Sequence, residues 1–333
     1  MAGAKRRISV VVPVYNESRL IAGFHAALLA MLQTLSYTFE IIYCDDGSSD
    51  ETPELIRAWC KKDDRVKLIR FSRNFGKESA LTAGLSEATG DAILTLDGDS
   101  QHPVELIPKF LAAWEAGAQV VIGVRTANSG EGWVKRHGSK LFYRLLNNIT
   151  GQKTVPGSSD FRLIDRVVQE AFLLLTETDR MTRALIDWLG FKREYVYFKA
   201  NAREDGAAGY TFSKLTKLAT NSFVSQSPQP LYISGYLGIF ITCAAFILGF
   251  AVFIEQILLG DPWSWNFTGT AMLGIMLLFL VGIVLVSQGV LALYISHIHS
   301  QAKGRPLYII DRAASAGLQG ETRVAKTHQT RKK

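Results

Sequence analysis

The chain has few cysteines for its length. Cys44, Cys60 and Cys243 are the only three among 333 residues. Their number is odd and their spacing is unpaired, which argues against a disulfide framework and against a cysteine-based zinc site. We therefore expect them to be small side chains of the interior.

Two familiar phosphate-binding loops are missing. No G-x-G-x-x-G follows the first apolar run, and no G-x-x-x-x-G-K-[ST] occurs anywhere. These loops hold the phosphates of dinucleotides and of nucleoside triphosphates, respectively. The sequence therefore excludes both a dehydrogenase of the dinucleotide-binding type and a P-loop enzyme.

Charged residues are also scarce, at 20%, and the mean hydropathy is +0.12. The apolar residues are concentrated in two charge-free runs, Leu231–Ile254 and Thr270–Ile295. Each exceeds the roughly 20 residues that a helix needs to cross a bilayer. We predict two transmembrane helices within residues 231–296. Helices buried in a soluble core are the alternative, which apolarity on all faces over this length disfavours.

The charges around these runs predict an orientation. The connecting loop carries Glu255 and Asp261 but no lysine or arginine, whereas residues 297–333 form a basic tail. By the positive-inside rule, both termini lie in the cytoplasm. Ile8–Val14 is too short to be the apolar core of a cleaved signal peptide. The tail could bind anionic lipid head groups or simply be solvated.

Residues 8–124 alternate short β-branched runs with longer amphipathic stretches, which predicts an α/β domain with a parallel sheet. We place this domain at residues 1–210 and a linker or interfacial helix at 211–230. The expected strands are Ile8–Val14, Glu40–Cys44, Val66–Phe71, Ala92–Leu96 and Gln119–Val124. The expected helices are Ser18–Leu35, Thr52–Lys61, Lys77–Ala88 and Pro103–Glu115.

Polar residues follow each expected strand, where ligands bind in such sheets. Asp97 and Asp99 flank the flexible Gly98, and Gln101 adds another oxygen. Oxygen ligands of this kind suit Mg²⁺ or Mn²⁺, which typically bridges a diphosphate. A turn or a helix cap is the alternative for an isolated Asp-x-Asp.

A nucleotide pocket is expected beside the metal site. Asp45 and Asp46 follow the second strand and could accept hydrogen bonds from a base or ribose. Helix capping is the other possibility for this turn. Residues that could wall the pocket or neutralise phosphate are Pro13, Tyr15, Glu17, Arg73 and Arg125.

The motifs P-V-Y-N-E, D-D-G-S-S-D, S-R-N-F-G-K, D-G-D-S-Q-H-P and S-D-F-R-L-I-D-R occur in this order. With them the chain resembles family 2 glycosyltransferases of the polyprenyl-phosphate class, such as dolichyl-phosphate mannose synthases and bactoprenol glucosyltransferases. The resemblance implies a Rossmann-like domain of the GT-A type. It also implies nucleotide-sugar contacts, metal contacts and catalytic roles. The residues are, for the nucleotide sugar, Pro13, Tyr15, Glu17, Asp46, Asp97, Gly98 and Arg125; for the metal, Asp97, Asp99 and Gln101; and for catalysis, Asp99 and Asp160 with Arg162.

Two positions depart from the family pattern. Ser159 stands where the family usually has glycine, and Gly209 stands where it usually has a basic residue. Arg203 and Lys214 are therefore candidates for the missing phosphate contact.

The resemblance implies inverting transfer of a hexose-type sugar from a UDP- or GDP-sugar to undecaprenyl or dolichyl phosphate. The acceptor would arrive from the lipids of a bacterial plasma membrane. Basic residues in two amphipathic stretches, 133–146 and 210–223, could bind its phosphate if these helices lie at the interface; core packing is the alternative. The candidates in these stretches are Arg136, Lys140, Arg144 and Lys214, and Arg162 is a further candidate for the acceptor phosphate.

Two other functions remain to be weighed. A processive polysaccharide synthase is disfavoured because no Q-x-x-R-W motif occurs. An inactive membrane scaffold is disfavoured because the acidic set is intact. We expect no nucleic-acid partner, and the sequence leaves homo-oligomerisation open.

Overall fold

The computed structural model describes residues 6–99, 102–126, 155, 157–178, 180–199, 236, 240, 243, 247 and 269–318. The chain divides into two compact units. One comprises residues 1–208 together with 304–333, and the other comprises residues 209–303.

The first unit is built on a seven-stranded sheet with the order β3-β2-β1-β4-β6-β5-β7. The α/β class is therefore confirmed, but the sheet is mixed rather than parallel, because β6 runs antiparallel to both β4 and β5. The strands are β1 (Arg7–Val14), β2 (Thr38–Asp45), β3 (Val66–Arg70), β4 (Ala92–Thr95), β5 (Val120–Arg125), β6 (Ser158–Asp165) and β7 (Arg193–Phe198).

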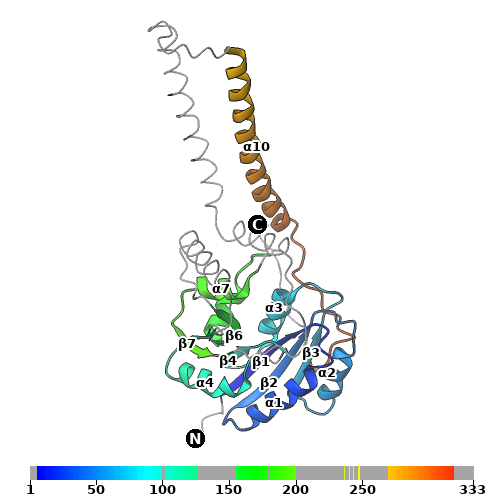
Figure 1. The fold of residues 1–333 in the computed structure, drawn as a ribbon. Coiled ribbons are helices and arrows are strands. Elements are labelled where there is room, and N and C mark those ends of the chain that lie inside the picture. Colours follow the sequence, from blue (N-terminus) through cyan, green and yellow to red (C-terminus); the bar gives the residue numbers. More distant parts are fainter. Residues whose placement is uncertain are drawn as a thin grey trace, which may run out of the picture. The chain divides into compact units, whose positions relative to one another are not determined.

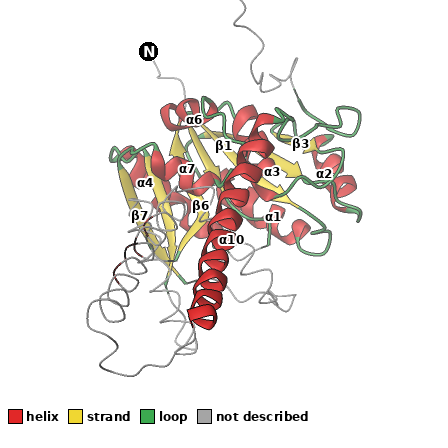
Figure 2. Ribbon diagram, turned by 90° about the horizontal axis from the view of Figure 1, so that it is seen from above, coloured by secondary structure: helices red, strands yellow, loops and turns green. Residues whose placement is uncertain are grey.

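Helices cover both faces of this sheet. In Figure 1, α3 and α7 lie above the sheet and α1 and α4 lie below it; Figure 2 looks down on the same layers. Buried side chains of α1, α2 and α4 form one apolar cluster with the sheet, and those of α3, α6 and α7 form another. The helices are α1 (Ile21–Gln33), α2 (Thr52–Cys60), α3 (Lys77–Glu87), α4 (Ile107–Glu115, after a 3₁₀ turn at Val104–Leu106), α6 (Arg166–Leu173) and α7 (Thr182–Trp188).

The packing of α3 on β1 depends on Gly84. A Cβ atom at this position would lie 2.2 Å from Cγ1 of Val11 and 2.8 Å from Sγ of the buried Cys44. Glycine therefore lets α3 approach the sheet closely. This contact sets the depth of the N-terminal end of α3, where Lys77 stands.

A buried carboxylate joins β1, β2, β3 and the turn before β4. Glu40 is fully buried and forms ion pairs with Lys67 at 2.8 Å and with Arg7 at 3.0 Å. The hydroxyl of Ser9 and the backbone N–H of Thr89 donate hydrogen bonds to it. Burial opposes the charge, but these partners outweigh it and lower the pKa of Glu40.

Residues 304–318, here called the C-terminal strap, return to the α/β unit and lie along β3 (Figure 1). Antiparallel bridges join Leu68 to Ala316 and Phe71 to Ile310. The ring of Tyr308 stacks on Phe71 with 5.0 Å between centroids. The strap therefore covers an edge strand that would otherwise present unpaired backbone groups. The sequence-based division had treated this stretch only as part of a basic tail.

The second unit contains α10 (Gly269–Ala302), a helix of 34 residues. Within the described residues it is the one helix long and apolar enough to cross a membrane, with a mean hydropathy of 2.1 over Phe279–Ser296. Its exposed side chains include Leu273, Met276, Leu277 and Phe279, which point to different sides of the helix. Of the first expected span, only Tyr236, Phe240, Cys243 and Ile247 are described, and all four are helical.

Candidate active site

The carboxyl ends of the parallel strands bring the expected site residues together. Val14 at the end of β1 pairs with Asp45 at the end of β2, and β4 pairs with β1 on its other side. The loops after β1, β2 and β4 therefore emerge at one edge of the sheet. This edge is where ligands bind in α/β proteins.

Hydrogen bonds join the loop after β1 to the loop after β2. The backbone N–H of Asn16, a residue with φ +55°, donates to Oγ of Ser48 at 2.9 Å. The side-chain oxygen of Asn16 accepts from the N–H of Ser49 at 2.9 Å, and the N–H of Glu17 donates to Oγ1 of Thr52. Tyr15 stands on this loop with 47% of its surface exposed, whereas Pro13 is buried within β1. Tyr15 can therefore face a ligand, and Pro13 shapes the strand beneath it.

The paired aspartates after β2 are both buried. Asp46 accepts hydrogen bonds from the backbone N–H groups of Phe75 at 2.6 Å and of Gly76 at 2.9 Å. Burial raises the pKa of Asp46, although these N–H groups favour its charged form. The loop after β2 also approaches the loop before α3 closely at Gly47 (φ +72°), where a Cβ atom would lie 2.6 Å from the carbonyl carbon of Arg73. Asp46 thus fixes the loop that precedes α3.

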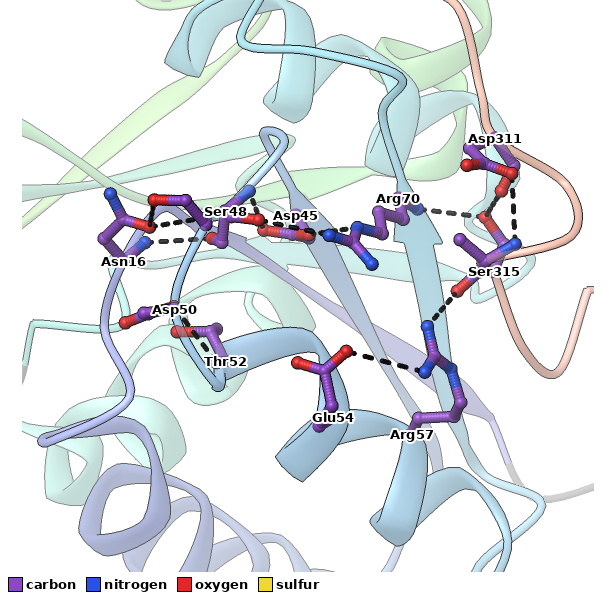
Figure 3. A network of polar contacts seen from close by, with 12 residues as sticks. Asn16, Asp45, Ser48, Asp50, Thr52, Glu54, Arg57, Arg70, Asp311 and Ser315 are labelled. Carbon is purple, nitrogen blue, oxygen red and sulfur yellow. Dashed lines mark hydrogen bonds and ion pairs between the residues drawn. The ribbon is translucent and has the colours of Figure 1, made fainter.

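Arg70 secures the other aspartate (Figure 3). Its Nε lies 3.3 Å from Oδ2 of the buried Asp45, and its Nη2 donates to the carbonyl of Ser48 at 3.1 Å. The backbone N–H of Arg70 in turn donates to Oγ of Ser315 on the C-terminal strap. Arg70 therefore ties the loop after β2, which carries Asp45 and Ser48, to the strap.

A cavity of about 380 Å³ lies between the ends of β4 and β6. We call it the β4–β6 cavity. It is lined by Lys77, Asp97, Asp99, Arg125, Gly157, Ser158, Ser159, Asp160 and Arg183.

Lys77, at the first position of α3, connects the two sides of this cavity. Its Nζ lies 2.6 Å from Oδ1 of Asp97 and 2.6 Å from Oδ2 of Asp160. Burial opposes the charge on Lys77, but the two carboxylates outweigh it and raise the pKa of the ammonium group. Burial likewise opposes the charge on Asp160, but Lys77, Arg183 and Arg162 lower its pKa. Asp160 is therefore held as an anion.

His102 links the Asp97 loop to Arg125. Its ring is 2% exposed; Nδ1 lies 3.2 Å from the backbone nitrogen of Asp97, and Nε2 lies 3.2 Å from Nη2 of Arg125. Burial is the main cause of its lowered pKa, so the imidazole is neutral. It stacks on Phe161 of β6. His102 therefore helps to place a carboxylate and a guanidinium at the cavity.

The structure does not place Arg162 where an acceptor phosphate could contact it. The side chain is 2% exposed, and Nη1 lies 2.9 Å from Oδ1 of Asp187 and 3.2 Å from the carbonyl of Arg183. Arg162 thus joins β6 to α7 in the interior, and it does not line the β4–β6 cavity, where Arg183 stands instead. A buried arginine held by so many oxygens cannot reach an acceptor phosphate in this arrangement.

The departure at Ser159 is accommodated without loss of packing. Its hydroxyl donates to the carbonyl of Gly123 at 2.9 Å, and the side chain is almost buried. Gly157, two residues before Ser159, has φ +84°. A Cβ atom at this position would lie 2.7 Å from the carbonyl oxygen of Arg125. Glycine is therefore required at 157 rather than at 159.

Several expected site residues lie outside the described residues: Gln101, Arg136, Lys140, Arg144, Arg203, Gly209 and Lys214. Conversely, Lys77, His102 and Arg183 had been given no role. Lys77 and His102 belong to motifs that the sequence presented, S-R-N-F-G-K and D-G-D-S-Q-H-P, so a closer reading of those motifs would have found them. No comparable signal marked Arg183.

The carboxylates of the cavity fit a divalent cation. Asp97 and Asp99 follow β4 and both line the cavity. The ammonium group of Lys77 at 2.6 Å from Asp97 indicates that this position attracts positive charge. Within the described part of the chain, no cluster of three or more histidine, cysteine or acidic residues could enclose a metal alone. The two carboxylates provide oxygen ligands of the kind that suit Mg²⁺ or Mn²⁺.

The sequence matches known proteins over most of its length. The family model Glycosyl transferase family 2 matches residues 9–172. The SfII prophage-derived bactoprenol glucosyl transferase of Shigella flexneri is 36% identical over 307 residues, covering 92% of this chain and 98% of that protein. The prophage bactoprenol glucosyl transferase homolog of Escherichia coli (strain K12) is 38% identical over 306 residues, covering 92% of this chain and 99% of that protein. The similarity therefore extends beyond the α/β unit into the C-terminal helix.

Proposed function

Because this chain belongs to glycosyl transferase family 2, as its motifs predicted, we propose that it transfers a sugar to a polyprenyl phosphate in a membrane. The donor is a nucleotide-activated hexose, UDP- or GDP-linked, and the product is a polyprenyl-phosphate sugar formed with inversion. UDP-glucose is the first donor to test, since similar proteins bear the name bactoprenol glucosyl transferase.

The observation that carries this proposal is the extent of the similarity. It covers 98% and 99% of two bactoprenol glucosyl transferase-type proteins, so it includes their C-terminal regions as well as a family 2 domain. A long apolar helix in the same chain as the catalytic domain is consistent with an acceptor that lies in the membrane. A shared membrane part is expected when the acceptor is a lipid.

The site supports distinct roles for its two ends. In our proposal, Tyr15, Glu17 and Asp46 contact the nucleotide, and Arg125 neutralises the diphosphate at the β4–β6 cavity. Asp97 and Asp99 would hold Mg²⁺ or Mn²⁺, which stabilises charge on the leaving diphosphate. Gln101 stays a candidate ligand.

Asp160 is proposed to orient the reacting groups rather than to remove a proton. The phosphate monoester of the acceptor is already ionised at neutral pH, because its second pKa is about 6. Its oxygen can attack C1 of the sugar without a strong base. An Asp160 whose pKa is lowered is a weak base, which fits this role.

We further propose that α10 and a second helix within residues 231–254 both span the membrane, so that the α/β unit and both termini lie in the cytoplasm. A helix that is apolar on all sides and exposed suits a lipid environment. The positive-inside rule and the basic residues after it favour this orientation.

A donor panel tests the proposal. The purified full chain in detergent should release nucleoside diphosphate from one sugar nucleotide when undecaprenyl phosphate and Mg²⁺ or Mn²⁺ are present. Release should stop without the lipid phosphate or after chelation of the metal. Polymer formation would indicate a polysaccharide synthase, and absence of release with every donor would indicate an inactive scaffold; either result contradicts the proposal.

A further inference from the structure

The positive side chains of the β4–β6 cavity come from different elements. Lys77 stands at the start of α3, Arg125 at the end of β5, and Arg183 in the first turn of α7. Arg125 lies on the His102 side, next to the Asp97 loop. Lys77 lies 2.6 Å from Asp160 as well as from Asp97, and Arg183 is joined through Arg162 to β6, the strand that carries Asp160. The cavity thus has two positively charged sides.

On the Asp160 side of the cavity, the backbone is held by hydrogen bonds while the charged side chains stay partly exposed. Arg162 donates to the carbonyl of Arg183 at 3.2 Å and pairs with Asp187, which anchors the first turn of α7 to β6. Arg183 itself is only partly buried. Lys77 keeps 42% of its side chain exposed while it bridges Asp97 and Asp160. Both cations therefore face the cavity from fixed backbone positions.

The charges on the Asp160 side of the cavity favour an anion there. Asp97 and Asp99 would be neutralised by the divalent cation proposed above, and Arg125 would face the diphosphate of the donor. On the Asp160 side, the carboxylate of Asp160 offsets one of the two positive charges of Lys77 and Arg183. Positive groups in a site partly shielded from water attract phosphate strongly, and arginine does so with paired hydrogen bonds.

We infer that Lys77 and Arg183 bind the phosphate monoester of the lipid acceptor on the Asp160 side of the β4–β6 cavity. This rests on the proposed function, and it places the acceptor contact on residues other than Arg136, Lys140, Arg162 and Lys214. An acceptor oxygen forms the new bond to C1, while the bond from C1 to the diphosphate oxygen breaks. Its electron pair leaves with the nucleoside diphosphate, and no proton is transferred.

Asp160 contributes by holding Lys77. Its carboxylate lies 2.6 Å from the ammonium group, which itself lies 2.6 Å from Asp97 on the donor side. Lys77 is therefore placed between donor and acceptor, where it offsets the repulsion between two phosphate-bearing substrates.

The test separates acceptor binding from donor binding. Arg183→Ala should raise the KM for undecaprenyl phosphate by roughly 10- to 100-fold, as expected for loss of a charge-assisted hydrogen bond. The dissociation constant for the nucleotide sugar should stay within about twofold of wild type, because Arg183 lies on the other side of the cavity. Lys109→Ala, an exposed lysine on α4, is the control and should change neither value.

A direct binding measurement complements the kinetics. Farnesyl phosphate should bind the wild-type chain in detergent about tenfold or more tightly than farnesol, because only the former carries the phosphate. Arg183→Ala and Lys77→Met should remove most of this difference. Nucleotide-sugar binding reports whether Arg183→Ala is folded, and Arg183→Lys replaces that variant if it is not. Thermal unfolding reports whether Lys77→Met is folded, because Lys77 also contacts Asp97 on the donor side.

The outcomes are distinguishable. If wild type transfers sugar to the lipid phosphate but the variants keep both the acceptor KM and the preference for farnesyl phosphate, the inference is wrong and the proposed function stands. A parallel rise in donor and acceptor constants also contradicts it. If wild type uses no lipid phosphate, the proposed function itself fails, and the inference with it.

Discussion

At the scale of single residues, two carboxylates, Glu40 and Asp160, differ in their partners and in their position relative to the cavity. Glu40 is fully buried among Lys67, Arg7, Ser9 and Thr89, far from the edge where ligands bind. Asp160 is paired with Lys77 at the cavity. We therefore assign the first carboxylate to stability and propose a role in the reaction for the second.

Glu40→Gln should lower the free energy of unfolding at pH 7 by about 1–3 kcal/mol, because Lys67 loses a charged partner near the interior. The folded pKa of Glu40 is lowered, so its stabilising contribution is fully present above the unfolded value, about 4.5, and is lost as pH falls through the folded pKa. Thermal unfolding of both chains in detergent should therefore show a difference that shrinks below about pH 4. A difference that grows in acid would contradict this role.

Asp160→Asn should reduce turnover by roughly 100-fold or more, since the amide cannot hold the ammonium group of Lys77 as firmly. The nucleotide-sugar dissociation constant should change little. Because the pKa of Asp160 is lowered, the loss should be the same between about pH 6 and 8. Glu170→Gln on the exposed side of α6 is the control, and near-normal turnover of Asp160→Asn would disprove the role.

Residue types and their positions after strands were sufficient to select Asp97 and Asp99 from the sequence, whereas Asp160 was selected through the family resemblance. The contacts were not predictable in the same way. Lys77 and Asp160 are 83 positions apart and meet only because β6 lies beside β4. Arg162 was given a ligand role on its motif alone, and nothing in the sequence indicated that Asp187 would pair with it.

At the scale of elements, the C-terminal strap connects the nucleotide-side loops to the end of the chain. Arg70 contacts Asp45 and Ser48 with its side chain, while its backbone pairs with Ser315 and Asp311 (Figure 3). Tyr308 anchors the strap through its stacking on Phe71 and a hydrogen bond with Ser86. The strap therefore supports the edge of the sheet on which the nucleotide pocket depends.

Tyr308→Ala should destabilise the α/β unit by roughly 2–4 kcal/mol, because it removes a mostly buried aromatic ring. It should also weaken nucleotide-sugar binding, since the strap supports Arg70. Tyr197→Ala is a matched control, because Tyr197 is 63% exposed on β7. Unfolding temperature and nucleotide-sugar affinity measure the two effects. If the two variants have the same unfolding temperature and the same nucleotide-sugar affinity, the strap does not stabilise the α/β unit in this way.

The first five strands were predictable because each is a β-branched run between polar turns. Their observed bounds differ from the expected ones by a residue or two. β6 and β7 were not predicted, because the strand assignment covered residues 8–124 only. Ser158–Asp165 was seen only as a motif, and Arg193–Phe198 was given no element although its tyrosines, valine and phenylalanine favour a strand. The antiparallel insertion of β6 depends on a long connection from β5, whose course periodicity cannot reveal.

At the scale of the whole molecule, a polar site and an apolar helix occur in one chain of formal net charge +7. Motif order identified the family, because several spaced motifs rarely coincide by chance. The motif order did not identify the sugar. A sugar is recognised through hydrogen bonds to its individual hydroxyl groups, and no single motif fixes the positions of the side chains that make them. The two parts together support the proposal of a lipid acceptor.

The most direct test is the mass of the lipid product. The full chain, incubated with undecaprenyl phosphate, UDP-glucose and Mg²⁺, should yield undecaprenyl phosphate heavier by one hexose, in an amount equal to the UDP released. The same product should be absent with Asp160→Asn. Release of UDP while the mass of the lipid stays unchanged would contradict the central claim, because the sugar would then have gone to water or to another acceptor.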